Sequence, residues 1–274
     1  AESIVGFEDT QALGRNVSVT ATRNYSIDAR LSGGWHLLGG VSRLKRDNTL
    51  VFQALPSISQ TSAEAGVRYV AASQNSITAM VRLREGANSG QVGDPVNFID
   101  DGFTVRESEL AAAWAVSGRS TLNGRLTRVA QRHEHIPQRD FSGLAGELGY
   151  AWTPTGRLSV NFSMLRSVSS FVQGTSASFR VEETLAFAPA WRVSERTTLR
   201  MSASRQVSEY LGPVVPVPGP LRRDILRSLR VTADWVANPK LTLSATLRRD
   251  QRSSTDAGFR YGSSIASADA ALSF

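Results

Sequence analysis

The sequence predicts an all-β fold, a closed antiparallel transmembrane β-barrel that occupies residues 1–274 as a single domain, and three observations predict it. Apolar and polar residues alternate with a period of two through many segments. Short turns and longer polar links follow one another in alternation, and all five tryptophans lie beside the short turns. A period of two is typical of β-strands, and short turns alternating with long loops are typical of barrels of the bacterial outer membrane.

The alternation is clearest in residues 241–247, which read LTLSATL and place leucines and alanine on one face and hydroxyl residues on the other. Residues 229–235, 77–83, 158–164 and 144–152 repeat the pattern. No window of about 18 consecutive apolar residues occurs, which argues against a transmembrane helix. A barrel fits, because only every second residue of its strands faces lipid.

We expect about 14 strands, within a range of roughly 12 to 18, with short periplasmic turns and longer extracellular loops. The expected spans are 2–12, 24–35, 37–46, 60–71, 75–85, 104–116, 120–132, 141–152, 157–167, 179–191, 196–207, 225–236, 240–250 and 259–274. An even number of strands places both termini on the periplasmic side. If the sequence is a fragment of a longer protein, the complete barrel has more strands. The run Gly33-Gly34-Trp35-His36 leaves little room for a turn, so a bulge or a shifted register is an alternative there.

The net charge of +7 comes from 31 basic and 24 acidic residues. A basic balance can indicate nucleic acid, an anionic membrane surface or an anionic solute as partner. The arginines are spread singly along the alternating segments rather than gathered in a run, so nucleic acid is not expected. The chain has no cysteine, which fits an exported protein and many cytosolic proteins alike.

Each tryptophan is predicted to end an alternating run just before a short turn. The five positions are Trp35, Trp114, Trp152, Trp191 and Trp235. Hydrophobic cores of a soluble protein are the alternative role for these side chains. Their shared position in the topology instead predicts an aromatic girdle near one rim of the barrel.

Charged residues of the alternating segments are predicted to face the lumen, because a charge on the lipid side near the midplane costs about 2–4 kcal/mol. The expected lumen-lining residues are Asp28, Arg30, Glu64, Arg68, Arg82, Arg84, Glu109, Arg125, Glu147, Arg200, Arg230, Asp234 and Arg248. One interpretation is a hydrated, salt-bridged wall. The other is a surface selective for an anionic or polyhydroxylated solute.

Candidates for catalysis or metal binding are few. His133-Glu134-His135 lies in an expected external loop and could offer two metal ligands, but the sequence identifies no third. Asp100-Asp101 could take part in acid–base chemistry, and nothing in the sequence brings these residues to the histidines. We therefore expect no enzymatic activity, no catalytic residue, no cofactor and no metal site.

The last predicted strand carries its small and apolar residues at alternate positions up to Phe274. A terminal aromatic residue on such a strand resembles the signal by which the outer-membrane assembly machinery recognises its clients. This resemblance assigns Phe274 as a terminal assembly signal.

Several short motifs resemble the EpsL-type outer-membrane proteins, which are encoded with exopolysaccharide-biosynthesis systems. The motifs are ATRNY at 21–25, RDFSGL at 139–144, WTPTG at 152–156, RRDQRSS at 248–254, GFRY at 258–261 and ALSF at 271–274. The resemblance implies a barrel that helps an extracellular polysaccharide to cross the outer membrane. It supplies no catalytic residues, and members of the family are usually longer at the N-terminus.

The sequence and the resemblance together predict an integral outer-membrane protein that is a conduit or accessory for polysaccharide export. A general or anion-selective porin is one alternative, and a structural barrel that anchors partner subunits is another. The expected partners are outer-membrane lipids and lipopolysaccharide. The resemblance adds a polysaccharide and periplasmic export proteins.

Overall fold

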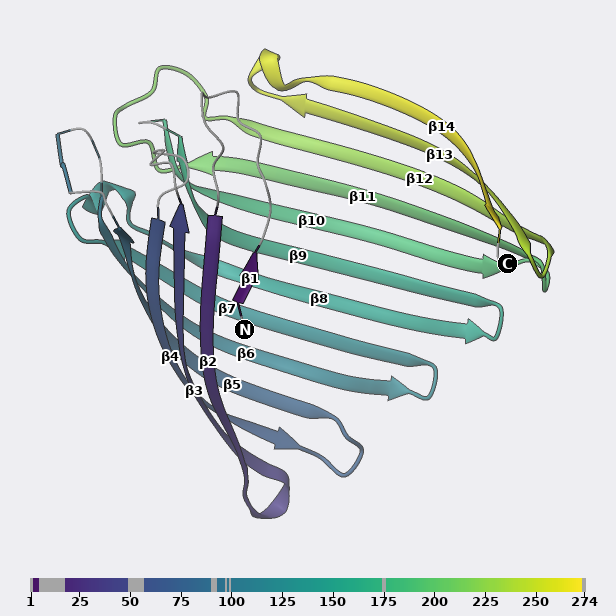
Figure 1. The fold of residues 1–274 in the computed structure, drawn as a ribbon, viewed down its shortest axis with the longest axis horizontal. Helices are drawn as coiled ribbons and strands as arrows, with labels where there is room; N and C mark the ends of the chain where they lie inside the picture. Colours follow the sequence, from purple (N-terminus) through teal and green to yellow (C-terminus); the bar gives the residue numbers. More distant parts are fainter. Residues whose placement is uncertain are drawn as a thin grey trace.

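A computed structural model describes residues 2–4, 18–48, 57–89, 93–96, 98, 100–173 and 176–272. Its strands form one 14-stranded sheet in which each strand pairs with its neighbours in sequence, from β1 to β14 (Figure 1). Each of these pairs is antiparallel, so the prediction of an all-β antiparallel meander is confirmed. Among the described residues no helix has the length and apolar character needed to cross a membrane.

The strands are β1 (Glu2–Ile4), β2 (Ser18–Arg30), β3 (Trp35–Asn48), β4 (Ser57–Val70), β5 (Ser76–Ser89), β6 (Gly102–Ser117), β7 (Ser120–His133), β8 (Phe141–Thr155), β9 (Leu158–Gln173), β10 (Ala177–Arg192), β11 (Thr197–Leu211), β12 (Arg223–Asn238), β13 (Leu241–Ser254) and β14 (Tyr261–Leu272). From β2 onward their lengths run from 12 residues in β14 to 16 in β6. That exceeds the about 9–11 residues with which a tilted strand crosses a bilayer.

The two ends of the sheet differ in the length of the links between strands. The short links follow β2, β4, β6, β8, β10 and β12, and we call their side the turn end. The other links lie at the opposite side, the loop end. The predicted spans 157–167 and 179–191 leave a longer link between them than the structure has, because β9 extends to Gln173 and β10 begins at Ala177.

The predicted second strand, 24–35, is wrong at both ends, because β2 begins at Ser18 and stops at Arg30. Gly33 and Gly34 have φ values of 67° and 83°, a conformation that favours glycine and reverses the chain within four residues. Trp35 therefore begins β3 rather than ending a strand. Of the predicted first strand, 2–12, only Glu2–Ile4 lies among the described residues.

Closure of the sheet into a barrel is not seen in the described residues, where β14 pairs only with β13. Both β2 and β14 run from the loop end to the turn end, so direct pairing between them would be parallel. An antiparallel closure needs the first strand in between, and the described part of that strand pairs only with Val19–Ala21 of β2. Figure 1 shows a strongly curved sheet with β1 and β2 at one margin and β14 at the other.

The register divides the strands into two faces. We call the face that carries the tryptophans outer; for example, Trp114 lies opposite Leu122, and Trp191 lies opposite Leu199. The other face is called inner. Large apolar side chains on the outer face are exposed, including Val81, 58% exposed, and Leu247, 65% exposed. The described structure thus has no continuous hydrophobic core beneath its outer face.

One apolar cluster lies at the loop end, where Val105, Val129 and Phe141 are buried on the inner face. Phe179 of β10 stacks on Phe141, with ring centroids 4.9 Å apart. By register Phe179 belongs to the outer face. It reaches Phe141 because β8 and β9 pair only from Gly146 and Arg166 toward the turn end. Beyond that point the outer side of the β9–β10 pair packs over the inner side of β7 and β8.

Candidate functional site

All five tryptophans lie on the outer face at the turn end of the sheet. Their exposed fractions lie between 44% for Trp152 and 50% for Trp35, Trp191 and Trp235. The indole of Trp35 packs against the ring of Tyr69, with centroids 5.1 Å apart. Their role as a membrane girdle stays a prediction. Phe274, the predicted assembly signal, lies outside the described residues.

The charged residues that were predicted to line a lumen all lie on the inner face, opposite to the tryptophans. They are Asp28, Arg30, Glu64, Arg68, Arg82, Arg84, Glu109, Arg125, Glu147, Arg200, Arg230, Asp234 and Arg248. Because the sheet is not closed in the described residues, a water-filled lumen along this face stays a proposal.

Three strands contribute to the first inner-face cluster. The imidazole Nδ1 of His36 on β3 lies 2.8 Å from the carboxylate of Asp28 on β2. The guanidinium of Arg68 on β4 contacts the same carboxylate. The sequence analysis named the two charged residues and missed His36, which lies just before the predicted strand 37–46, in the run Gly33-Gly34-Trp35-His36 where the register was left open.

A second inner-face cluster is centred on Glu107, whose side chain is 9% exposed. Arg82 donates from Nε to Glu64 and from Nη1 to Glu107, at 2.8 Å each. Arg84 also donates to Glu107. The cluster joins β4, β5 and β6 by charge-assisted hydrogen bonds, and Glu107 is the member that the sequence did not single out.

The row of charges continues across the later strands. Arg125 lies 2.6 Å from Glu147 and 4.0 Å from Glu109. Arg200 lies 2.6 Å from Asp234, and on β13 Arg248 lies 2.6 Å from Asp250.

Two predicted arginines, Arg30 and Arg230, make no ion pair with a described residue. Most positive charge of the predicted set is therefore balanced locally, and these two positions carry an excess.

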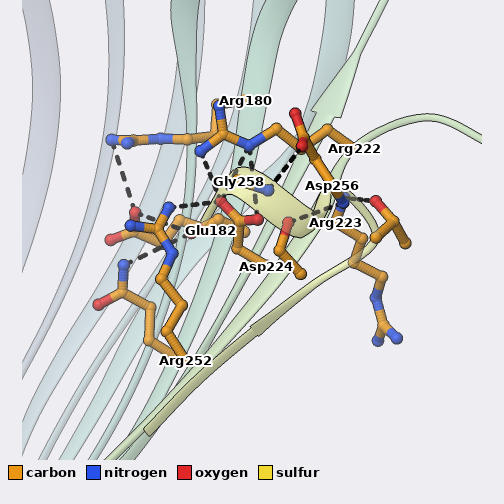
Figure 2. A network of polar contacts seen from close by, with 12 residues as sticks. Arg180, Glu182, Arg222, Arg223, Asp224, Arg252, Asp256 and Gly258 are labelled. Atoms are coloured by element: carbon orange, nitrogen blue, oxygen red, sulfur yellow. Dashed lines mark hydrogen bonds and ion pairs between the residues drawn. The ribbon is translucent and has the colours of Figure 1, made fainter. Parts of the chain in front are cut away.

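A larger polar cluster lies at the loop end. It is centred on Asp224, whose side chain is 4% exposed. Arg222 donates to this carboxylate from Nε at 3.1 Å and from Nη2 at 2.9 Å, and Arg252 donates from Nη2 at 2.6 Å. Figure 2 shows the arginine side chains converging on Asp224. The guanidinium of Arg222 also lies 3.4 Å from the ring centroid of Phe259 and 4.3 Å from that of Tyr210. The cluster thereby fastens the β11–β12 and β13–β14 links to the sheet.

The links at residues 93–101 and 134–140 meet at a group formed by Asp100, Asp101 and His135, whose side-chain ligand atoms lie within 4.8 Å of one another. No pattern in the sequence predicted that Asp100-Asp101 and His135 meet. Asp100 accepts hydrogen bonds from the amides of Gly102, His135 and Ile136, at 3.1, 3.3 and 3.2 Å. These contacts make Asp100 a bridge between the two links.

Electrostatics stabilise the charged form of Asp101. Burial by itself would raise the pKa of its carboxyl group. Hydrogen bonds involving its own backbone and that of Gly93, together with the His135 ring, outweigh burial and hold the pKa below its ordinary value. His133 does not join this group, because its Nδ1 lies 3.5 Å from Asp140 instead.

No family model and no curated protein matches the chain. Among solved structures, the ferric yersiniabactin uptake receptor FyuA from Yersinia pestis matches with a TM-score of 0.46 and 10% identity, over 89% of this chain and 44% of that chain. The siderophore receptor PirA from Pseudomonas aeruginosa matches with a TM-score of 0.47 and 11% identity, over 94% and 57%. This chain thus spans about half of the length of these two receptors.

A third solved structure, a bacterial polysaccharide outer membrane secretin, matches with a TM-score of 0.31 and 12% identity over 100% of this chain and 96% of that chain. All three TM-scores are below 0.5. None of the three is described as an EpsL-type protein.

Proposed function

We propose that the chain is an integral outer-membrane β-barrel whose inner face lines a hydrated path, and that it acts as a conduit or accessory for export of an extracellular polysaccharide. The membrane location is supported by the positions along the strands at which charged residues occur on each of the two faces. On the inner face, charged residues occur along most of the strand length. On the outer face of the described strands they occur only in the half nearer the loop end.

Strand β13 shows this outer-face boundary. Its outer positions from the turn end are Leu241, Leu243, Ala245 and Leu247, and the next is Arg249. In β9 an apolar series of the same length ends at Arg166. About eight residues at a rise of about 3.3 Å span roughly 26 Å along a strand, or about 20 Å after a tilt of about 40°. That height is close to the apolar band of about 25 Å that surrounds membrane barrels.

Membrane insertion would also require the sheet to close, because a strand edge in hydrocarbon leaves backbone amides and carbonyls without partners. We infer that the segment containing β1 lies between β14 and β2. This arrangement keeps every neighbouring pair antiparallel, which direct pairing of β14 with β2 would not.

A polysaccharide fits the inner face because hydroxyl, amide and guanidinium groups are spread along it. A hydrated sugar chain can exchange weak contacts with such groups as it moves. The resemblance to EpsL-type proteins supports export as the physiological direction. The ion pairs around Arg82 and Arg125 would hold the wall in place without fixing the solute.

Conductance of the purified full chain in planar lipid bilayers tests this function. We expect ion current that alginate, an anionic polysaccharide, blocks, with weaker block by neutral dextran. Ion current that neither polymer blocks would contradict the conduit and support a porin. No current, together with stable co-purification of other subunits, would support the anchoring role.

An anion-selective porin is the second candidate, because Arg30 and Arg230 lack ion-pair partners among the described residues. Reversal potentials in a salt gradient distinguish it. An anion preference that falls when both arginines are changed to glutamine, without block by alginate, would favour this candidate.

A further inference from the structure

The outer face carries a row of arginines at the loop-end boundary of its apolar band. The exposed members that make no ion pair with a described residue include Arg23, Arg43, Arg106, Arg128, Arg205, Arg227 and Arg249. They point away from the inner face, so a solute on the inner face does not reach them. Their position requires a separate explanation.

Three of these arginines converge on neighbouring strands. Arg205 of β11 lies directly opposite Arg227 of β12, and Arg249 of β13 lines the same groove. Like charges placed directly opposite each other on a sheet repel. The nearby outer carboxylates do not relieve this repulsion, because Glu183 is engaged with Arg166, and Glu209 accepts a hydrogen bond from Arg223 at 3.0 Å.

The groove below these arginines has a volume of about 400 Å³ and an apolar floor. Phe162, Leu185, Phe187 and Leu229 form most of this floor, on strands β9, β10 and β12. All four belong to the outer face by register. The floor is therefore continuous with the apolar band, and the positive charge lies only at its loop-end margin.

We propose that this groove binds a phosphorylated lipid, whose phosphate lies among Arg205, Arg227 and Arg249 and whose acyl chain covers the apolar floor. The inference rests on the proposed function, because it requires an outer face in contact with lipid. Guanidinium groups pair with phosphate oxygens through two parallel hydrogen bonds, which matches a cluster of arginines without acidic partners. A free phosphate would neutralise the arginines but leave the floor exposed.

The chain offers a matched control. Arg23 and Arg43 also lie directly opposite each other on the outer face, on β2 and β3, and Arg128 lies at a similar height on β7. None of the three lines the apolar groove. Replacing them removes the same number of charges from the same face and leaves the groove unchanged.

The test compares R205Q/R227Q/R249Q with R23Q/R43Q/R128Q and the unmodified full chain in detergent. Native mass spectrometry measures retention of added lipid A and of lipid A from which the phosphates have been removed. Circular dichroism near 215 nm confirms that each variant is folded. We expect the groove variant to lose at least tenfold in lipid A affinity, the control variant to stay within about twofold, and the dephosphorylated lipid to bind weakly to all three proteins.

Equal losses in both triple variants would overturn the groove and indicate unspecific attraction to the row of arginines. Undiminished binding of the dephosphorylated lipid would overturn the role of the phosphate. Binding of inorganic phosphate without lipid A would reveal an anion site only. Lipid A binding is measured in detergent and does not require insertion into a membrane. Failure of the barrel to insert into vesicles would therefore contradict the proposed function, while the lipid A affinities would still decide whether the groove is the binding site.

Discussion

Glu107 is the residue on which the inner-face charge cluster depends, since it is nearly buried and contacts both Arg82 and Arg84. Glu107→Gln would leave Arg84 without its carboxylate and Arg82 with Glu64 alone, and we expect a loss of about 3 kcal/mol in the free energy of unfolding. Urea unfolding followed by tryptophan fluorescence measures it. Glu147→Gln is the control, because that carboxylate is 47% exposed and its loss is expected to cost under about 1 kcal/mol. Equal costs would contradict the central place of Glu107.

Asp224 leads to a second prediction for a single residue, because one of its partners, Arg222, lies in the β11–β12 link at the loop end, while the other, Arg252, lies on β13. Asp224→Asn weakens the hydrogen bonds from Arg222 and Arg252, each charge-assisted and worth about 1.5–3 kcal/mol. We expect the link at 212–222 to open more often and to be cleaved by trypsin roughly 10 to 100 times faster, since 1.4 kcal/mol is tenfold in an equilibrium constant. Glu209→Gln, which removes an exposed ion pair with Arg223, should leave the cleavage rate nearly unchanged.

The charged residues also show which features of the site could be predicted from the sequence. Parity along the strands is enough to place Asp28, Arg125 and Asp234 on one face, because a period of two leaves only two choices. The alternating pattern does not show how far along its strand a charge lies, and therefore how deep in the bilayer it would be. The penalty for a charge facing lipid is largest at the midplane and falls toward the interface, so outward arginines such as Arg205 are tolerated at the boundary. The penalty at the midplane alone predicts that all charges in the strands turn inward, so this row of outer-face arginines was not predicted.

At the scale of elements, the β2–β3 turn depends on Gly34, which has a φ of 83°. A Cβ atom at this position would lie 2.3 Å from the carbonyl oxygen of Val70 on β4. We expect Gly34→Ala to destabilise the folded state by about 2–3 kcal/mol, from the strained φ together with a clash against backbone. Gly33→Ala, with a φ of 67° and its nearest neighbour at 3.9 Å, is expected to cost only about 1 kcal/mol. The urea concentrations at the unfolding midpoints of the two variants measure this difference in stability.

Strand boundaries were predictable where turn-forming residues interrupt the alternation. The predicted span 120–132 agrees with β7, Ser120–His133, within one residue at each end. At the loop end the prediction stops early, as for 157–167 against β9, Leu158–Gln173, because polar and apolar residues occur on both faces of β9 there and the alternation is no longer visible. The contacts of Asp100 with the 134–140 link and of Arg222 with Asp224 could not be predicted, because they join links that carry no periodic signal.

For the whole molecule, the alternation predicted an antiparallel meander but could not establish which strands meet at the seam. That depends on the direction of the first strand, which is a three-residue segment in the described residues. Whichever strands meet at the seam, we propose that lipid covers the outer face between the tryptophans and the arginines while the inner face is in contact with water.

Cysteine labelling in lipid vesicles tests this claim most directly, since the chain has no cysteine of its own. Single cysteines replace Leu243, Ala245 and Leu247 on the outer face of β13, and Ser244 and Thr246 on the inner face. A charged, water-soluble maleimide should label the two inner positions at least tenfold faster than the three outer ones. Equal labelling of all five positions, or faster labelling of the outer ones, would contradict the account.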